Sequence, residues 1–103
     1  MENPENLNQE MNIELPADIA EGIYSNLAII THSPNEFIID FVSIMPGIPK
    51  ARVRSRIILT PQNAKRLLKA LENNIKTFEK THGAIKEQDI NIPLNFGTPP
   101  AQA

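Results

Sequence analysis

The clearest pattern along the chain is a helical repeat of apolar positions in its second half. Thr60 can cap the start of a helix, and Pro61 suits the first helical position, where its missing N–H needs no partner. Gly83 supplies the left-handed residue that commonly ends a helix. The pattern therefore predicts a helix over residues 61–82. The apolar residues follow one face of a 3.6-residue period: Ala64, Leu67, Leu68, Leu71, Ile75 and Phe78.

Three segments before this helix predict β-strands. Residues 23–32, 36–45 and 50–59 are rich in β-branched and aromatic side chains. The segments 33–35 and 46–49 contain the Pro, Asn and Gly residues typical of turns, and such short connections favour antiparallel neighbours. We expect an α+β fold, in which a three- or four-stranded antiparallel β-meander is followed by one long C-terminal helix packed on one face.

The segment ahead of the three strands predicts two shorter elements. Met11, Ile13 and Leu15 alternate with polar residues, which indicates a short leading strand that Pro16 ends. Residues 17–22 are compatible with one helical turn that finishes at a glycine.

Alternation along the strands divides the sheet into two apolar faces. One helix can cover only one of them, and we expect it to cover the face of Phe37, Phe41, Val53 and Ile57. The opposite face then presents three aliphatic side chains beside a row of arginines. These are the candidate binding residues: Ile38, Val42, Ile44, Arg52, Arg54 and Arg56.

An uncovered apolar face of this kind predicts a partner, because monomers seldom leave such a set in water. Burial of each aliphatic side chain contributes roughly 1.5–3 kcal/mol, so a few of them suffice to drive association. The leading interpretation is a homo-oligomer, with another protein as the partner in a second interpretation. In a third, the N-terminal segment or the C-terminal tail of the same chain folds over this face.

The arginines at every second position permit three interpretations. On a strand, Arg52, Arg54 and Arg56 would point the same way at intervals of about 6.6–6.8 Å, close to the phosphate spacing of an extended nucleic acid. They would otherwise pair with protein carboxylates, with Asp40 as the expected cross-strand neighbour, or remain solvated. Single-strand binders usually add aromatic stacking platforms, and only Tyr24 is a good candidate for one.

Charge is unevenly distributed along the 103 residues, although the net charge is −2. Residues 1–45 contain eight acidic residues and no Lys or Arg, whereas residues 46–82 contain nine basic residues. This segregation is compatible with pairing between the two halves, either within one chain or across a dimer.

No signature of catalysis is present. The chain has no cysteine, which excludes disulfides, thiolate metal sites and cysteine nucleophiles. His32 and His82 are too few and too far apart for a metal motif, and the four glycines form no phosphate-binding loop. We expect a protein that is not an enzyme and that holds no metal or cofactor.

The ends of the chain differ from its middle. Residues 1–10 are polar and aperiodic, which predicts a disordered N-terminus, and residues 84–103 contain several prolines, which predicts a flexible C-terminal tail. We therefore expect one domain over residues 11–83. Residues 90–96 alternate apolar and polar types, which would also suit docking on a sheet edge. The chain has neither a signal-like start nor an apolar run near the ~20 residues that span a bilayer, so we expect a cytoplasmic protein without a membrane partner.

Two stretches resemble a small bacterial family known as domain of unknown function 3467. They are SNLAIITHSPNEFIIDF and SRIILTPQNAKRLL, within a similarity that covers about residues 13–83. The resemblance implies no activity, cofactor or catalytic residue. The sequence thus predicts a non-enzymatic protein-interaction module, accessory to a larger bacterial assembly. The alternative is a nucleic-acid-binding or transcription-associated factor that uses the arginine row.

Overall fold

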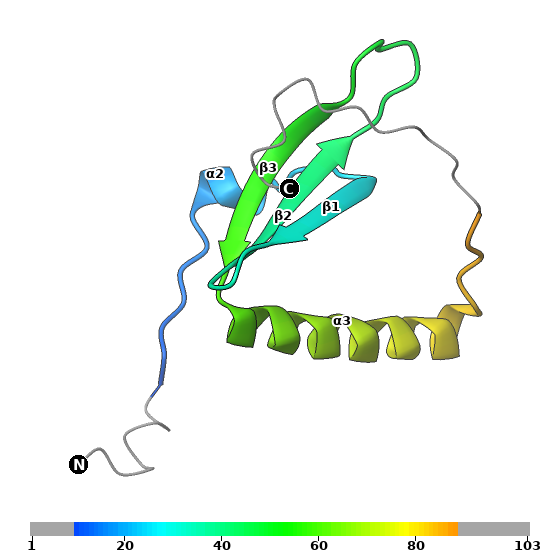
Figure 1. The fold of residues 1–103 in the computed structure, drawn as a ribbon. Helices are drawn as coiled ribbons and strands as arrows, with labels where there is room; N and C mark the ends of the chain where they lie inside the picture. Colours follow the sequence, from blue (N-terminus) through cyan, green and yellow to red (C-terminus); the bar gives the residue numbers. More distant parts are fainter. Residues whose placement is uncertain (1–9, 89–103) are drawn as a thin grey trace.

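The computed structural model describes residues 10–88, which form three strands and two helices (Figure 1). Of the N-terminus predicted to be disordered (residues 1–10), residues 1–9 lie outside this range, as do residues 89–103 of the predicted tail, which include the possible edge segment 90–96. The elements in chain order are α2 (Ala17–Ala20), β1 (Leu27–His32), β2 (Phe37–Ser43), β3 (Arg52–Leu59) and α3 (Pro61–His82).

The strands form one antiparallel sheet in the order β1-β2-β3, which confirms the predicted α+β meander. The predicted strands were each too long by a few residues at their ends. The predicted leading strand is wrong: residues 11–15 form no strand, and the first element of the described chain is the short helix α2. An alternating pattern alone does not make a strand when no neighbouring strand supplies its backbone partners.

Asn26 extends the pairing of β1 and β2 beyond the last strand residue. Its side-chain Nδ2 donates to the carbonyl oxygen of Ile44 at 3.0 Å, and its Oδ1 accepts from the Ile44 N–H at 2.8 Å. The Asn26 N–H also donates to the Val42 carbonyl at 3.0 Å. One asparagine thus fixes the start of β1 against the end of β2.

A bulge interrupts the pairing of β2 and β3. Phe41 pairs with Ser55, whereas the next residue, Val42, pairs with Val53, so Arg54 is an extra residue of β3. A bulge of this kind shifts the alternation of side chains on one strand relative to its neighbour. Residues of β3 before and after Arg54 therefore do not keep the simple two-residue period of the sequence.

Helix α3 follows β3 after a single residue, and its bounds confirm the predicted helix. Thr60 is the N-cap, with its Oγ1 accepting from the Asn63 N–H at 3.2 Å, and Pro61 occupies the first turn. At the other end, Gly83 has φ 91° and donates its N–H to the Glu79 carbonyl at 2.9 Å. Glycine suits this position because a Cβ disfavours positive φ.

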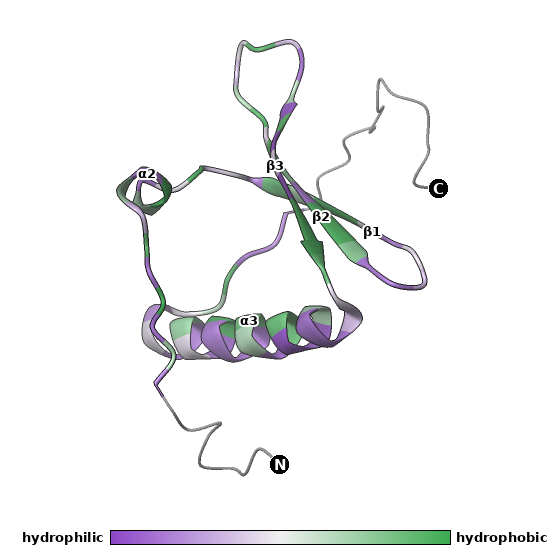
Figure 2. Cartoon of the chain, turned by 90° about the vertical axis from the view of Figure 1, so that its left-hand side faces the viewer, coloured by the Kyte–Doolittle hydropathy of each residue, from purple (hydrophilic) through white to green (hydrophobic). Residues whose placement is uncertain are grey.

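The helix approaches the sheet less closely than the sequence predicts. Its start lies beside the end of β3, and the helix then runs away from the strands, so that sheet and helix enclose an open wedge (Figure 2). No residue of α3 is buried. The buried part of the described chain is confined to the central strand: Ile39, Asp40, Val42 and Ser43.

Candidate protein-interaction surface

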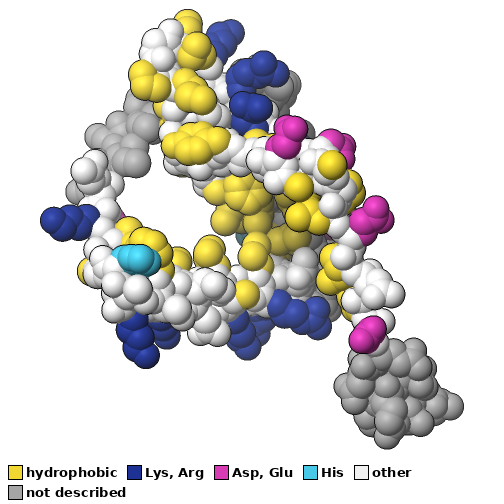
Figure 3. Space-filling model, turned by 180° about the vertical axis from the view of Figure 1, so that it is seen from behind, with side chains coloured by type: hydrophobic (Ala, Val, Ile, Leu, Met, Phe, Trp, Pro, Cys, Tyr) yellow, Lys and Arg dark blue, Asp and Glu magenta, His cyan; other side chains and the backbone are white. Residues whose placement is uncertain are grey.

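The wedge between sheet and helix is an apolar groove that is open to solvent. Its two sides face one another in Figure 3, with hydrophobic side chains around an opening. We call it the open groove. Its sheet side consists of Ile39, Phe41, Ile57 and Leu59, and its helix side of Asn63, Arg66, Leu67 and Ala70.

The groove continues toward the N-terminal segment. A second hollow shares Phe41 and Ile57 with the open groove and reaches Asp18 and Ile19 of α2. The sheet face of the groove thus has α2 near one end and the start of α3 near the other, with neither element lying flat on it.

Apolar side chains are exposed on both the sheet and the helix that flank this groove. On the sheet, Ile30 pairs with Ile39 and remains 60% exposed, because nothing in the described chain lies over it. On the helix, Leu71, Ile75 and Phe78 remain 54%, 38% and 49% exposed. Two apolar surfaces that would normally bury one another are therefore both in water.

The N-terminal segment adds a further exposed apolar set. Met11, Ile13 and Leu15 are exposed, as are Ile19 of α2 and Ile23 beyond it. Acidic residues lie among them, including Glu14, Asp18 and Glu21. This segment combines apolar side chains with negative charge.

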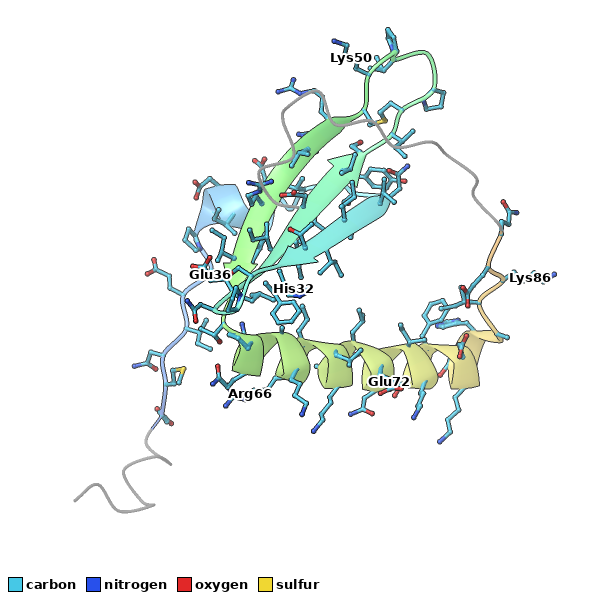
Figure 4. The ribbon with its side chains drawn as sticks, in the orientation of Figure 1. His32, Glu36, Lys50, Arg66, Glu72 and Lys86 are labelled. Atoms are coloured by element: carbon cyan, nitrogen blue, oxygen red, sulfur yellow. The ribbon has the colours of Figure 1, made fainter. Side chains whose placement is uncertain are left out.

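Most basic residues of α3 lie on the side of the helix away from the groove, whereas Arg66 lines it. Figure 3 shows Lys and Arg side chains along this outer side, and Figure 4 shows Glu72 there as well. The helix carries five basic residues against two acidic ones. The basic residues are Lys65, Arg66, Lys69, Lys76 and Lys80, and the acidic residues are Glu72 and Glu79.

One ion pair joins the strands on the opposite face of the sheet. Arg56 donates from Nε to Asp40 Oδ1 at 2.6 Å and from Nη2 to Oδ2 at 2.8 Å. The hydrogen bonds from Arg56 lower the pKa of the Asp40 carboxyl, against the opposing effect of its burial. The same hydrogen bonds raise the pKa of the Arg56 guanidinium. The pairing with Asp40, one of the interpretations drawn from sequence, is thus present.

The predicted arginine row does not keep a common direction. Arg56 is paired opposite Asp40 and Arg52 opposite Ser43, and these two β2 residues lie on different faces because they are three positions apart. Arg54 is the bulged residue between them. The regular spacing that suggested successive phosphate contacts is therefore lost, although Arg52 and Arg54 are exposed.

The three aliphatic residues predicted for the binding face differ in how much surface they offer. Val42 is only 4% exposed, so it serves the packing of the sheet. Ile38 and Ile44 are partly exposed, and the backbone of Ile44 is held by Asn26. Apolar exposure occurs on both faces of the sheet. Ile58 and Val53, paired with Ile38 and Val42, are 58% and 44% exposed on this face, and Ile30 and Ile57 are 60% and 41% exposed on the face of the groove.

Sequence reasoning missed the groove because it expected the helix to close over it. Phe41 and Ile57, predicted to be covered, do line the groove, but Val53 is moved to another register by the bulge. The signal in the sequence was the short link at Thr60 between strand and helix. A one-residue link restricts how far a helix can turn back over the sheet it follows.

Other binding features are limited within the described range. Residues 10–88 contain no group of three or more His, Asp or Glu residues placed to hold a metal ion. None of the helices over these residues is long and apolar enough to cross a membrane. The Ser43 hydroxyl is buried and has no hydrogen-bond partner among the described residues.

These features define a small α+β protein with an open apolar groove. The chain belongs to the family described as Protein of unknown function (DUF3467), whose family model matches residues 1–87. This confirms the resemblance seen in the sequence. Neither the curated proteins nor the solved structures contain a match to the chain.

Proposed function

We propose that this protein is a non-enzymatic protein-interaction module that self-associates and acts as an accessory in a larger bacterial assembly. The observation that carries the proposal is the exposure of apolar side chains on both the sheet and the helix that flank the open groove. Ile30 on the sheet and Leu71 on the helix both stay in water, although each belongs to a surface of the kind that proteins bury.

The size of the buried core supports association. Only Ile39 and Val42 are buried among the apolar residues of the described chain. A domain this small is marginally stable at best, and a partner that covers the groove adds apolar burial without a longer chain. Self-association supplies such a partner from the same gene product.

The geometry gives less support to nucleic-acid binding through the arginines. Arg56 is engaged by Asp40, and the bulge separates Arg52 and Arg54 from the regular phosphate-like spacing. We therefore assign the exposed arginines to solvated charge or to carboxylates of a partner.

Sedimentation velocity of the full chain over a range of micromolar concentrations tests self-association. We expect a species of twice the 11.5 kDa chain mass, with a monomer fraction that grows on dilution. A native pull-down with and without nuclease tests the protein partner. Captured proteins that survive nuclease support the module, whereas a monomer that captures only nucleic acid overturns it.

A further inference from the structure

We infer that a second copy of this chain fills the open groove, so that α3 of each copy lies across the sheet of the other. This inference rests on the proposed self-association and names the surface and the arrangement that produce it. It commits to an exchange of helices, rather than to contact through the face of Ile38 and the arginines.

The helix carries an apolar stripe that its own sheet does not use. Leu67 and Ala70 line the groove of their own chain, but Leu71, Ile75 and Phe78 do not. These three residues belong to the later turns, where α3 has left the strands (Figure 2). A sheet from another molecule can cover them.

The sheet likewise has apolar side chains that no element of its own chain covers. Ile30 and Ile57 are 60% and 41% exposed on the face that α3 leaves open. One surface therefore needs a helix and the other needs a sheet, and the chain contains both. In a dimer with a two-fold axis, the helix of each copy covers the sheet of the other. The same contact is therefore made twice, and both exposed surfaces of each copy become buried.

The link between strand and helix opposes closure within one chain. Leu59 ends β3, and Thr60 alone precedes Pro61, whose ring fixes φ. Thr60 is also held in extended geometry, φ −67° and ψ 154°, as the N-cap. With a single residue in the link, only the backbone dihedral angles at Leu59 and Thr60 can redirect α3 toward its own sheet.

Charge favours the same occupant. Asp18 lines the hollow beside the groove, and Glu21 follows α2 directly. Helix α3 carries five basic residues and two acidic ones, so its net positive charge favours the approach of a second α3 to the acidic residues of and beside α2.

Cross-linking between differently tagged copies tests the arrangement, because the chain has no cysteine of its own. Copies with Leu71→Cys are mixed with copies with Ile30→Cys and treated with a short bismaleimide. We expect a covalent product that contains both tags. The matched control replaces Leu71→Cys by Lys76→Cys on the outer side of α3, and we expect little product.

Substitutions measure the energetic contribution. Leu71→Gln with Ile75→Gln places two polar residues in the stripe, and Lys69→Gln with Lys76→Gln places the same residues on the outer side. We expect the dimer dissociation constant to rise at least about 30-fold for the first pair, as for central interface residues. The second pair should change it less than about 3-fold. Far-UV circular dichroism checks that both remain helical.

The outcomes separate this inference from the proposed function. Three results would overturn the helix exchange but not self-association. The dimer would give no cross-link, it would give equal amounts of product with cysteine at positions 71 and 76, or its dissociation constant would change equally with both glutamine pairs. Cross-linking within a single Ile30→Cys, Leu71→Cys chain, without a product between chains, also overturns it. A wild-type monomer at all concentrations refutes self-association itself and the exchange with it.

Discussion

Arg56 of β3 holds Asp40 of β2 through two parallel hydrogen bonds of 2.6 and 2.8 Å. The two partners differ sharply in environment, since the Asp40 side chain is 4% exposed and the Arg56 side chain 57% exposed. The exposed guanidinium therefore compensates a carboxylate that is almost fully withdrawn from water. This pair joins the central strand to its neighbour close to the bulge at Arg54.

Loss of the guanidinium should destabilise the fold more than loss of a neighbouring one. Arg56→Met leaves the buried Asp40 carboxylate without its ion-pair partner, and we expect a cost of about 1–3 kcal/mol in the free energy of unfolding at neutral pH. Arg54→Met, at the exposed bulge, is the matched control and should cost less than about 0.5 kcal/mol. Urea unfolding followed by circular dichroism at one fixed protein concentration measures both. Equal losses would contradict the assigned role of Arg56.

Acid should weaken the wild-type protein through Asp40. Its folded-state pKa lies below the ordinary value of 3.8, so ionised Asp40 contributes stability that is fully present above that value. This contribution is lost as the pH falls through the lower, folded-state pKa. Asp40→Asn removes the titrating group, and we expect a flatter dependence of unfolding free energy on pH between about 5 and 2. Parallel curves for the two proteins would count against a lowered pKa.

Removal of the N-cap should weaken α3. Thr60→Ala deletes the hydroxyl that accepts from the Asn63 N–H, and typical caps contribute about 1 kcal/mol. Thr77→Ala is a control, because its hydroxyl bonds only the Asn73 carbonyl within the helix and alanine has the higher helix propensity. Urea unfolding at a fixed protein concentration should show a loss for Thr60→Ala and none for Thr77→Ala. A stable Thr60→Ala would indicate that packing, and not the cap, defines the start of α3.

Self-association predicts a melting temperature that depends on protein concentration. A ligand that binds only the folded state stabilises it by mass action, and here that ligand is a second chain. A tenfold increase in concentration should stabilise the dimer by about 1.4 kcal/mol and raise Tm by several degrees. Thermal scans at three concentrations check this, with Leu71→Gln, Ile75→Gln as the comparison. A constant Tm for the wild type would contradict an obligate dimer.

The sequence predicted the elements whose signals are local. Thr60, Pro61 and Gly83 set the bounds of α3 directly, and the short turns set the order of the strands. The partnership of Arg56 with Asp40 was also accessible, because cross-strand neighbours follow from strand order. Each of these depends on residues close in sequence or on one hairpin.

Features that depend on register and on packing were not accessible. Arg54 is recognised as a bulged residue only when the register of β2 and β3 is known. The alternation of Val53, Arg54 and Ser55 in the sequence does not predict it. The direction of α3 depends on a junction geometry that an apolar repeat does not encode. The groove on the other face of the sheet therefore could not be predicted, and the binding face proposed from sequence stays a prediction beside it.

The single residue between β3 and α3 has an architectural consequence. Short connections between elements promote exchange of those elements between molecules, and longer ones let an element return to its own molecule. A flexible insertion after Thr60 would thus allow α3 to pack on the sheet of its own chain. If the proposed exchange of helices is correct, the length of this one junction determines whether the fold is completed within one chain or between two.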